Sequence, residues 1–168
     1  MVGRNGLTRE LLVRIFAEAG MEDPVSHLAT GNVSFGGTGD SADLAERIGN
    51  AIAVVIGRIE PVFIRTIDHL REQVENDPFR DPPFADVHER CVSFAHGSIA
   101  GLDLPLATAR GDSMAFAARD GDIFSVTRVV GGRPGTMGKT LERTLGRLVT
   151  TRNWNTIELI VRHQAPTD

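Results

Sequence analysis

The sequence has few of the residues that mark several common classes of protein. Its single cysteine, Cys91, excludes a disulfide framework and a cysteine-based zinc site. No segment reaches the ~18 consecutive apolar residues of a membrane span, and the N-terminus lacks the apolar region of a signal peptide. Tyrosine is absent and tryptophan occurs once, so surfaces that stack nucleic-acid bases would be small. These absences favour a cytoplasmic protein with no membrane partner.

Length and composition are those of a globular protein. The 168 residues, 41% of them hydrophobic, suffice for one domain or for two very small domains that share a core. The net charge of −4 gives no general attraction to nucleic acid. The charge is uneven, however, because residues 128–152 contain six basic residues and one acidic residue. This basic segment is either a solvated helix face with a loop or a place where an anionic ligand binds.

The first half of the chain, residues 1–80, is predicted to be an α+β unit. Apolar spacing and capping residues first predict a helix, whose apolar stripe runs from Leu7 to Ala19, and then two strands at 25–28 and 33–35. A second helix is predicted after Ser41, followed by a strand at Pro61–Arg65 and a third helix capped by Thr66. One further strand in front would complete the ferredoxin-like, or split βαβ, order. The first half is therefore predicted to be ferredoxin-like without its first strand.

The second half, residues 87–168, is predicted to be a smaller antiparallel β unit with two helices. A strand at about 88–95 is followed by a hairpin of residues 113–118 and 123–130 around Asp120-Gly121. A helix with Leu141, Leu145 and Leu148 on one side comes next, and a last helix is expected at about 154–163. Residues 77–86, which contain three prolines and three aspartates, are the predicted boundary, although the halves could also form one continuous domain.

Three stretches, in the right order along the chain, resemble the bacterial domain-of-unknown-function 1697 family (DUF1697). They are Val2-Gly3-Arg4-Asn5, Thr30-Gly31-Asn32-Val33-Ser34-Phe35, and Leu141-Glu142-Arg143-Thr144-Leu145-Gly146 with Thr151-Arg152-Asn153-Trp154-Asn155-Thr156. The last stretch is the most specific. The resemblance implies a cytosolic α+β protein, and it implies no mechanism because the activity of such proteins is unassigned.

The resemblance also implies an additional first strand. Sequences of that family begin with an apolar strand and a Gly-rich turn, and Met1 stands where the turn would begin. The first strand of a ferredoxin-like unit is central, so its loss would expose the edges of two neighbouring strands. We expect either that the start codon lies upstream, or that another segment or a second chain fills the place. An intact mass of the native protein that matches a start at Met1 would exclude the first explanation.

A glycine-rich segment, Gly131–Thr140, precedes the fourth predicted helix. It is not a P-loop, because the position that must be glycine is Arg133. Backbone N–H groups of this loop could still hold an anion together with Arg133 and Lys139. The alternative is a flexible loop that enters a helix.

Two further sets of polar residues have both a structural and a binding interpretation. Asn153 or Asn155 can cap the last helix with Trp154 in the core, or Arg152 and an asparagine can face the 131–139 loop and bind a phosphate or carboxylate. Thr30-Gly31-Asn32 can form a turn, or Asn32 can join Arg4 and Asn5 at a polar cleft.

No pattern in the sequence identifies a reaction. The five histidines show no metal-ligand spacing, no Gly-x-Ser-x-Gly motif is present, and we expect neither a metal nor a cofactor. The leading hypothesis is a non-enzymatic binding protein for an anionic small molecule or nucleic acid. The first alternative is an enzyme that acts on a phosphorylated or carboxylated substrate, with Lys139 and Arg152 as electrostatic stabilisers. The second is an interaction module that forms a homodimer.

Overall fold

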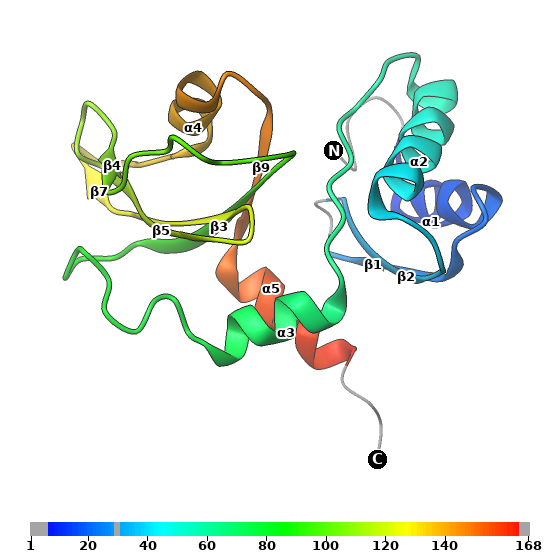
Figure 1. Ribbon diagram of the computed structural model, residues 1–168, viewed down its shortest axis with the longest axis horizontal. Coiled ribbons are helices and arrows are strands. Elements are labelled where there is room, and N and C mark those ends of the chain that lie inside the picture. The colour runs from blue at the N-terminus through cyan, green and yellow to red at the C-terminus, as the bar shows by residue number, and fades with distance from the viewer. Residues whose placement is uncertain (1–6, 29–30, 165–168) are drawn as a thin grey trace. The chain divides into compact units, whose positions relative to one another are not determined.

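The computed structural model describes residues 7–28 and 31–164 and has an α+β architecture (Figure 1). The chain divides into two compact units, residues 1–65 and residues 66–168. The division lies just before helix α3 (Ile67–Glu75), so α3 is grouped with the second unit. The boundary expected from the sequence, residues 77–86, lies inside that unit. No helix within the described residues is long and apolar enough to cross a lipid bilayer.

The first unit contains two helices and a two-stranded antiparallel sheet in the predicted α-β-β-α order. Helix α1 (Arg9–Glu18) begins after Thr8, whose side chain accepts a hydrogen bond from the Leu11 N–H at 3.1 Å. Strands β1 (Glu22–His27) and β2 (Asn32–Gly36) pair next to each other. Helix α2 (Ser41–Ile56) is capped by Asp40 and ends at Gly57, which adopts the left-handed conformation that glycine favours.

The core of the first unit lies between the two helices and the sheet. Its buried residues are apolar side chains at helical spacing, chiefly Leu12, Ile15 and Phe16 of α1 and Leu44, Ile48 and Ile52 of α2. Val33 and Phe35 of β2 pack against this cluster, and the rings of Phe16 and Phe35 meet edge to face at 5.6 Å.

The predicted strand at Pro61–Arg65 is wrong, because these residues form no strand. Their apolar side chains do follow the expected pattern, since Val62 and Ile64 pack against the core of the first unit. A strand also requires a ladder of backbone hydrogen bonds to a neighbour, and no described strand runs beside this segment. The missing first strand was expected to precede Met1, so the described residues do not test it, and residues 1–6, where the turn was expected, lie outside them.

The second unit is built on a five-stranded antiparallel sheet with the order β4-β5-β6-β3-β9. The strands are β3 (Glu89–Ala95), β4 (Leu106–Ala107), β5 (Ser113–Arg119), β6 (Asp122–Thr127) and β9 (Val149–Asn153). The predicted hairpin is confirmed, because Asp120 and Gly121 join β5 to β6 with positive φ angles of 51° and 84°. A small separate hairpin pairs β7 (Val129–Val130) with β8 (Arg133–Pro134).

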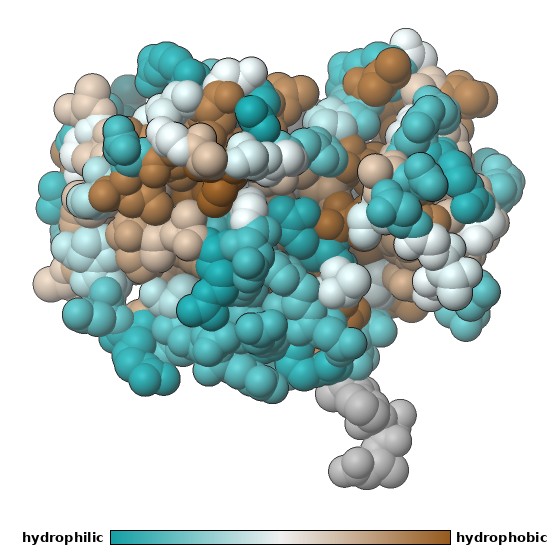
Figure 2. Space-filling model, viewed as in Figure 1, coloured by the Kyte–Doolittle hydropathy of each residue, from teal (hydrophilic) through white to brown (hydrophobic). Residues whose placement is uncertain are grey.

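Helices cover both faces of this sheet. Helix α4 (Gly138–Leu145) covers one face, where Ala115, Ile123, Met137 and Leu141 are buried together. On the other face the rings of Phe79, Phe124 and Trp154 meet at centroid distances of 5.2 to 5.9 Å. Helix α5 (Trp154–His163) lies on this face beside α3, whose outer surface is hydrophilic (Figures 1 and 2).

The fourth helix is shorter than the sequence predicts. It ends at Leu145 because Gly146 adopts the left-handed conformation, with a φ of 65°. Leu148, which was expected on the apolar side of this helix, lies beyond its end and is 56% exposed. The chain then enters β9, which the sequence analysis did not predict.

Candidate functional site

The Arg152–Thr156 run has the structural role that the capping hypothesis predicts. Asn153 is the N-cap of α5, and its side chain accepts a hydrogen bond from the Asn155 N–H at 3.0 Å. The Asn155 side chain in turn accepts a hydrogen bond from Arg90 at 3.0 Å. Trp154 is 1% exposed and anchors the aromatic cluster. Both asparagine carbonyl oxygens therefore already accept hydrogen bonds inside the protein.

Arg152 lies on β9, the strand at one edge of the sheet, and forms hydrogen bonds within that strand. Its guanidinium donates to the Thr150 hydroxyl at 2.6 Å and to the Thr151 carbonyl at 3.0 Å, and burial lowers the pKa of the group. The hydroxyl of Thr151 faces Gly138 of α4. Because side chains alternate along a strand, Arg152 points to the opposite face of the sheet from α4. The structure therefore does not bring Arg152 together with Lys139, which is exposed on α4.

The glycine-rich segment is explained by its local structure. Gly131 and Gly132 have φ angles of 60° and 73° and form the two-residue turn between β7 and β8, a turn that requires positive φ at both positions. Arg133 and Lys139 are exposed, and their side chains form no hydrogen bond or ion pair with any described residue. Arg4 and Asn5 lie outside the described residues, and Asn32 pairs with His27 in the first unit. A ligand role for these residues stays a prediction.

Half of the cations in the basic segment 128–152 form contacts inside the second unit. Arg128 donates to the Gly111 carbonyl at 2.8 Å and lies over the Phe84 ring at 4.6 Å. Arg147 donates to the His96 carbonyl at 2.9 Å. With Arg152, three arginines therefore stabilise loops and strands. This distribution weakens the case for one continuous anion-binding surface in the segment.

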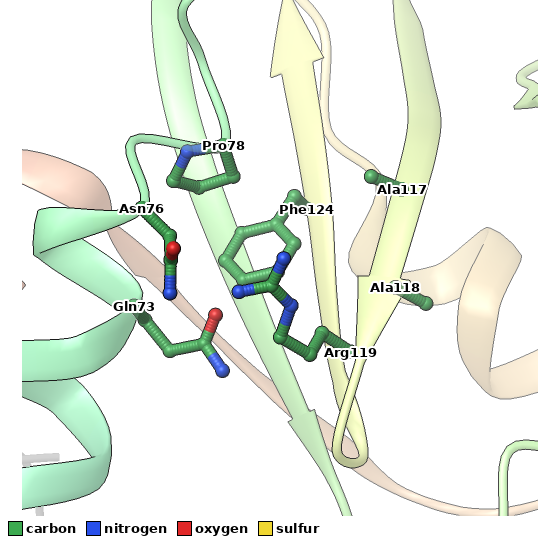
Figure 3. A pocket seen from close by; sticks show the side chains of 7 residues that line it. All are labelled: Gln73, Asn76, Pro78, Ala117, Ala118, Arg119 and Phe124. Atoms are coloured by element: carbon green, nitrogen blue, oxygen red, sulfur yellow. The ribbon is translucent and has the colours of Figure 1, made fainter.

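A pocket of about 140 Å³ lies between the end of α3 and strand β5, and we call it the α3–β5 pocket (Figure 3). Its polar side chains come from Gln73, Asn76 and Arg119. Its apolar walls are Pro78, Ala117, Ala118 and Phe124. In Figure 3 the Arg119 guanidinium lies in front of the Phe124 ring, and the Gln73 side chain reaches toward it from α3 with the amide oxygen on the near side. This arrangement combines hydrogen-bond donors, one cation and a small apolar surface.

Two polar groups in the α3–β5 pocket have no partner in the described part of the chain. Gln73 is only 2% exposed, yet its amide nitrogen Nε2 forms no hydrogen bond. The side chain of Arg119 is exposed and forms no hydrogen bond or ion pair. Asn76, by contrast, donates to the Glu72 carbonyl at 2.9 Å and so completes the end of α3. An unsatisfied buried donor costs about 1–3 kcal/mol, and the buried hydroxyls of Ser26, Ser125 and Thr127 also form no hydrogen bond with a described residue.

A partly buried hydrogen bond joins α3 to the β5–β6 hairpin beside the pocket. His69 lies one helical turn before Gln73, and its Nε2 is 2.6 Å from Oδ2 of Asp122. Asp122 is fully buried and stands opposite Arg119 in the β5–β6 register. Since His69 is on α3 and Asp122 is on the hairpin, this contact fixes the spacing between Gln73 and Arg119.

Cys91 is buried in β3, as predicted, and the low polarity around it raises the pKa of its thiol to about 12. Because the thiolate is the reactive form, we expect Cys91 of the native protein to resist alkylation by iodoacetamide at pH 8 and to react fully in denaturant. Mass spectrometry after timed labelling measures both rates. Rapid native labelling would contradict the burial of this residue.

The described residues contain no group of three potential metal-ligating side chains. The residues of the α3–β5 pocket were also not identified from the sequence, because Gln73 and Arg119 are far apart in the chain and meet only through folding. One signal was present: Gln73 lies three residues after Leu70 on the apolar stripe of α3, where a polar amide is unusual. Arg119 directly precedes the Asp-Gly turn, but that position alone indicates only a strand end.

Comparisons with known proteins identify a family and a fold. The model of a family described as protein of unknown function (DUF1697) matches residues 1–124. Among solved structures, a conserved bacterial protein from Streptococcus pneumoniae is similar at a TM-score of 0.67. The alignment has 19% identity and covers 98% of this chain and 93% of that protein. At this identity the likeness shows the fold alone, and no curated protein matches the chain.

Proposed function

Because the chain belongs to the DUF1697 family, whose description assigns no activity, we propose its function from the geometry of the second unit. The protein binds a small anionic molecule in the α3–β5 pocket. Arg119 supplies the positive charge, and Gln73 supplies a hydrogen-bond donor. The role is that of a binding protein, and we assign no reaction to it.

The observation that carries this proposal is the amide nitrogen of Gln73. Buried polar groups are almost always hydrogen-bonded, and exceptions in a folded protein call for an explanation. The nitrogen is a donor, so the group that satisfies it must be an acceptor. Gln73 lines the same pocket as the exposed guanidinium of Arg119, and an anion is a type of acceptor that suits both side chains.

The end of α3 opposes anion binding, and the charge of Arg119 favours it. A helix C-terminus carries partial negative charge, worth about 0.3–1 kcal/mol at an exposed position. The Asn76 side chain and backbone N–H groups already satisfy carbonyls in the last turn of α3, which reduces that charge. Arg119 offsets this effect with a charge-assisted hydrogen bond, which contributes about 0.2–1 kcal/mol at an exposed position.

We propose the cytoplasm as the location, since an unpaired cysteine is stable in a reducing compartment. Nucleic acid is a weaker candidate for the ligand than a small anion. Binding along a phosphate backbone needs several aligned cations, and three of those in residues 128–152 form internal contacts. Formation of a homodimer stays a prediction.

Replacing the pocket arginine tests the proposal. We expect acetate to shift the side-chain amide signal of Gln73 in a saturable NMR titration of the whole chain, and the Arg119→Gln variant to lose several-fold in affinity. The reason is the loss of a charge-assisted hydrogen bond, because about 1 kcal/mol at an exposed position corresponds to roughly fivefold in affinity.

The matched control is Arg143→Gln, which removes an exposed cation of α4 that does not line the pocket. This variant should bind acetate as the parent chain does. Equal losses in the two variants would show a general effect of net charge and would contradict a site at Arg119. Loss in Arg133→Gln, with Arg119→Gln unaffected, would place the anion at the β7–β8 turn instead.

A further inference from the structure

We draw no further inference here: the strongest candidate, the surface patch of exposed apolar side chains that Val54, Val55 and Ile59 form at and just beyond the end of α2, carries no proposal because nothing in the structure shows what covers it.

Discussion

Replacing Trp154 by alanine is expected to lower the free energy of unfolding of the second unit by about 3–5 kcal/mol. The indole is 1% exposed and is the largest fully buried side chain of the described residues. It contacts the rings of Phe79 and Phe124 at centroid distances of 5.2 and 5.8 Å. Its removal would leave a cavity in the aromatic cluster and would also loosen the start of α5, which begins at this residue.

Circular dichroism during urea unfolding measures this effect, because the variant lacks the only tryptophan of the chain. Trp154→Phe is the matched control, since it keeps an aromatic ring in the cluster and should lose less than half as much. A similar loss in both variants would show that the indole contributes no more than a phenyl ring. A loss below about 1 kcal/mol in the alanine variant would contradict the core role of Trp154.

Replacing Gly135 by alanine is expected to cost the second unit about 3 kcal/mol or more, at the upper end of overpacking effects. A Cβ atom at this position would lie 2.0 Å from the backbone carbonyl oxygen of Asp112. That contact cannot be relieved by a side-chain rotation, because the atom it meets belongs to the main chain. The backbone of Gly135 has no positive φ, so the cost arises from this contact and not from the preference of glycine for that conformation.

The displaced segment carries further interactions. The Asp112 carbonyl accepts a hydrogen bond from the Arg128 N–H at 2.9 Å, and its carboxylate accepts one from the Thr108 hydroxyl at 2.6 Å. A shift of Asp112 would weaken both. The fluorescence of Trp154 during urea unfolding reports on this unit directly, since Trp154 lies in its core.

Gly138→Ala is the matched control for Gly135→Ala. This residue begins α4, and an added Cβ would lie 3.4 Å from the Thr151 hydroxyl, which is an ordinary contact. Alanine is favoured over glycine in a helix by about 1 kcal/mol, so the control should be neutral or slightly stabilising. Equal destabilisation by the two substitutions would contradict the close approach at Gly135.

Local signals were sufficient to predict most helices of this fold. Thr8, Thr66 and Asn153 each cap the helix that follows, because a cap depends on residues only two or three positions apart. The Asp-Gly turn predicted its hairpin for the same reason. Strand β9 was missed because it depends on pairing with β3, which is almost 60 residues away along the chain. The β-branched run Val149-Thr150-Thr151 was its one local signal.

The candidate site was less predictable than the fold. The sequence pointed to the basic segment and the Asn-Trp-Asn run, because local charge and short motifs can be recognised from neighbouring residues alone. The structure instead uses Arg152, Asn153 and Asn155 for internal hydrogen bonds. Gln73 is one of four buried side chains in the described part of the chain with an unpartnered polar atom, and whether a side chain finds a partner is decided only when distant segments pack together.

The outer edge of β9 affects how the protein behaves at high concentration. The Val149 N–H donates to the Glu142 carboxylate at 3.4 Å, and the Thr151 carbonyl accepts from Arg152. Because outward-facing groups alternate along an edge strand, these two contacts cover neighbouring positions that another strand would need for pairing. The protein's own charged side chains thus close this edge against open-ended strand addition. We expect Glu142 and Arg152 to delay fibril growth in concentrated solution.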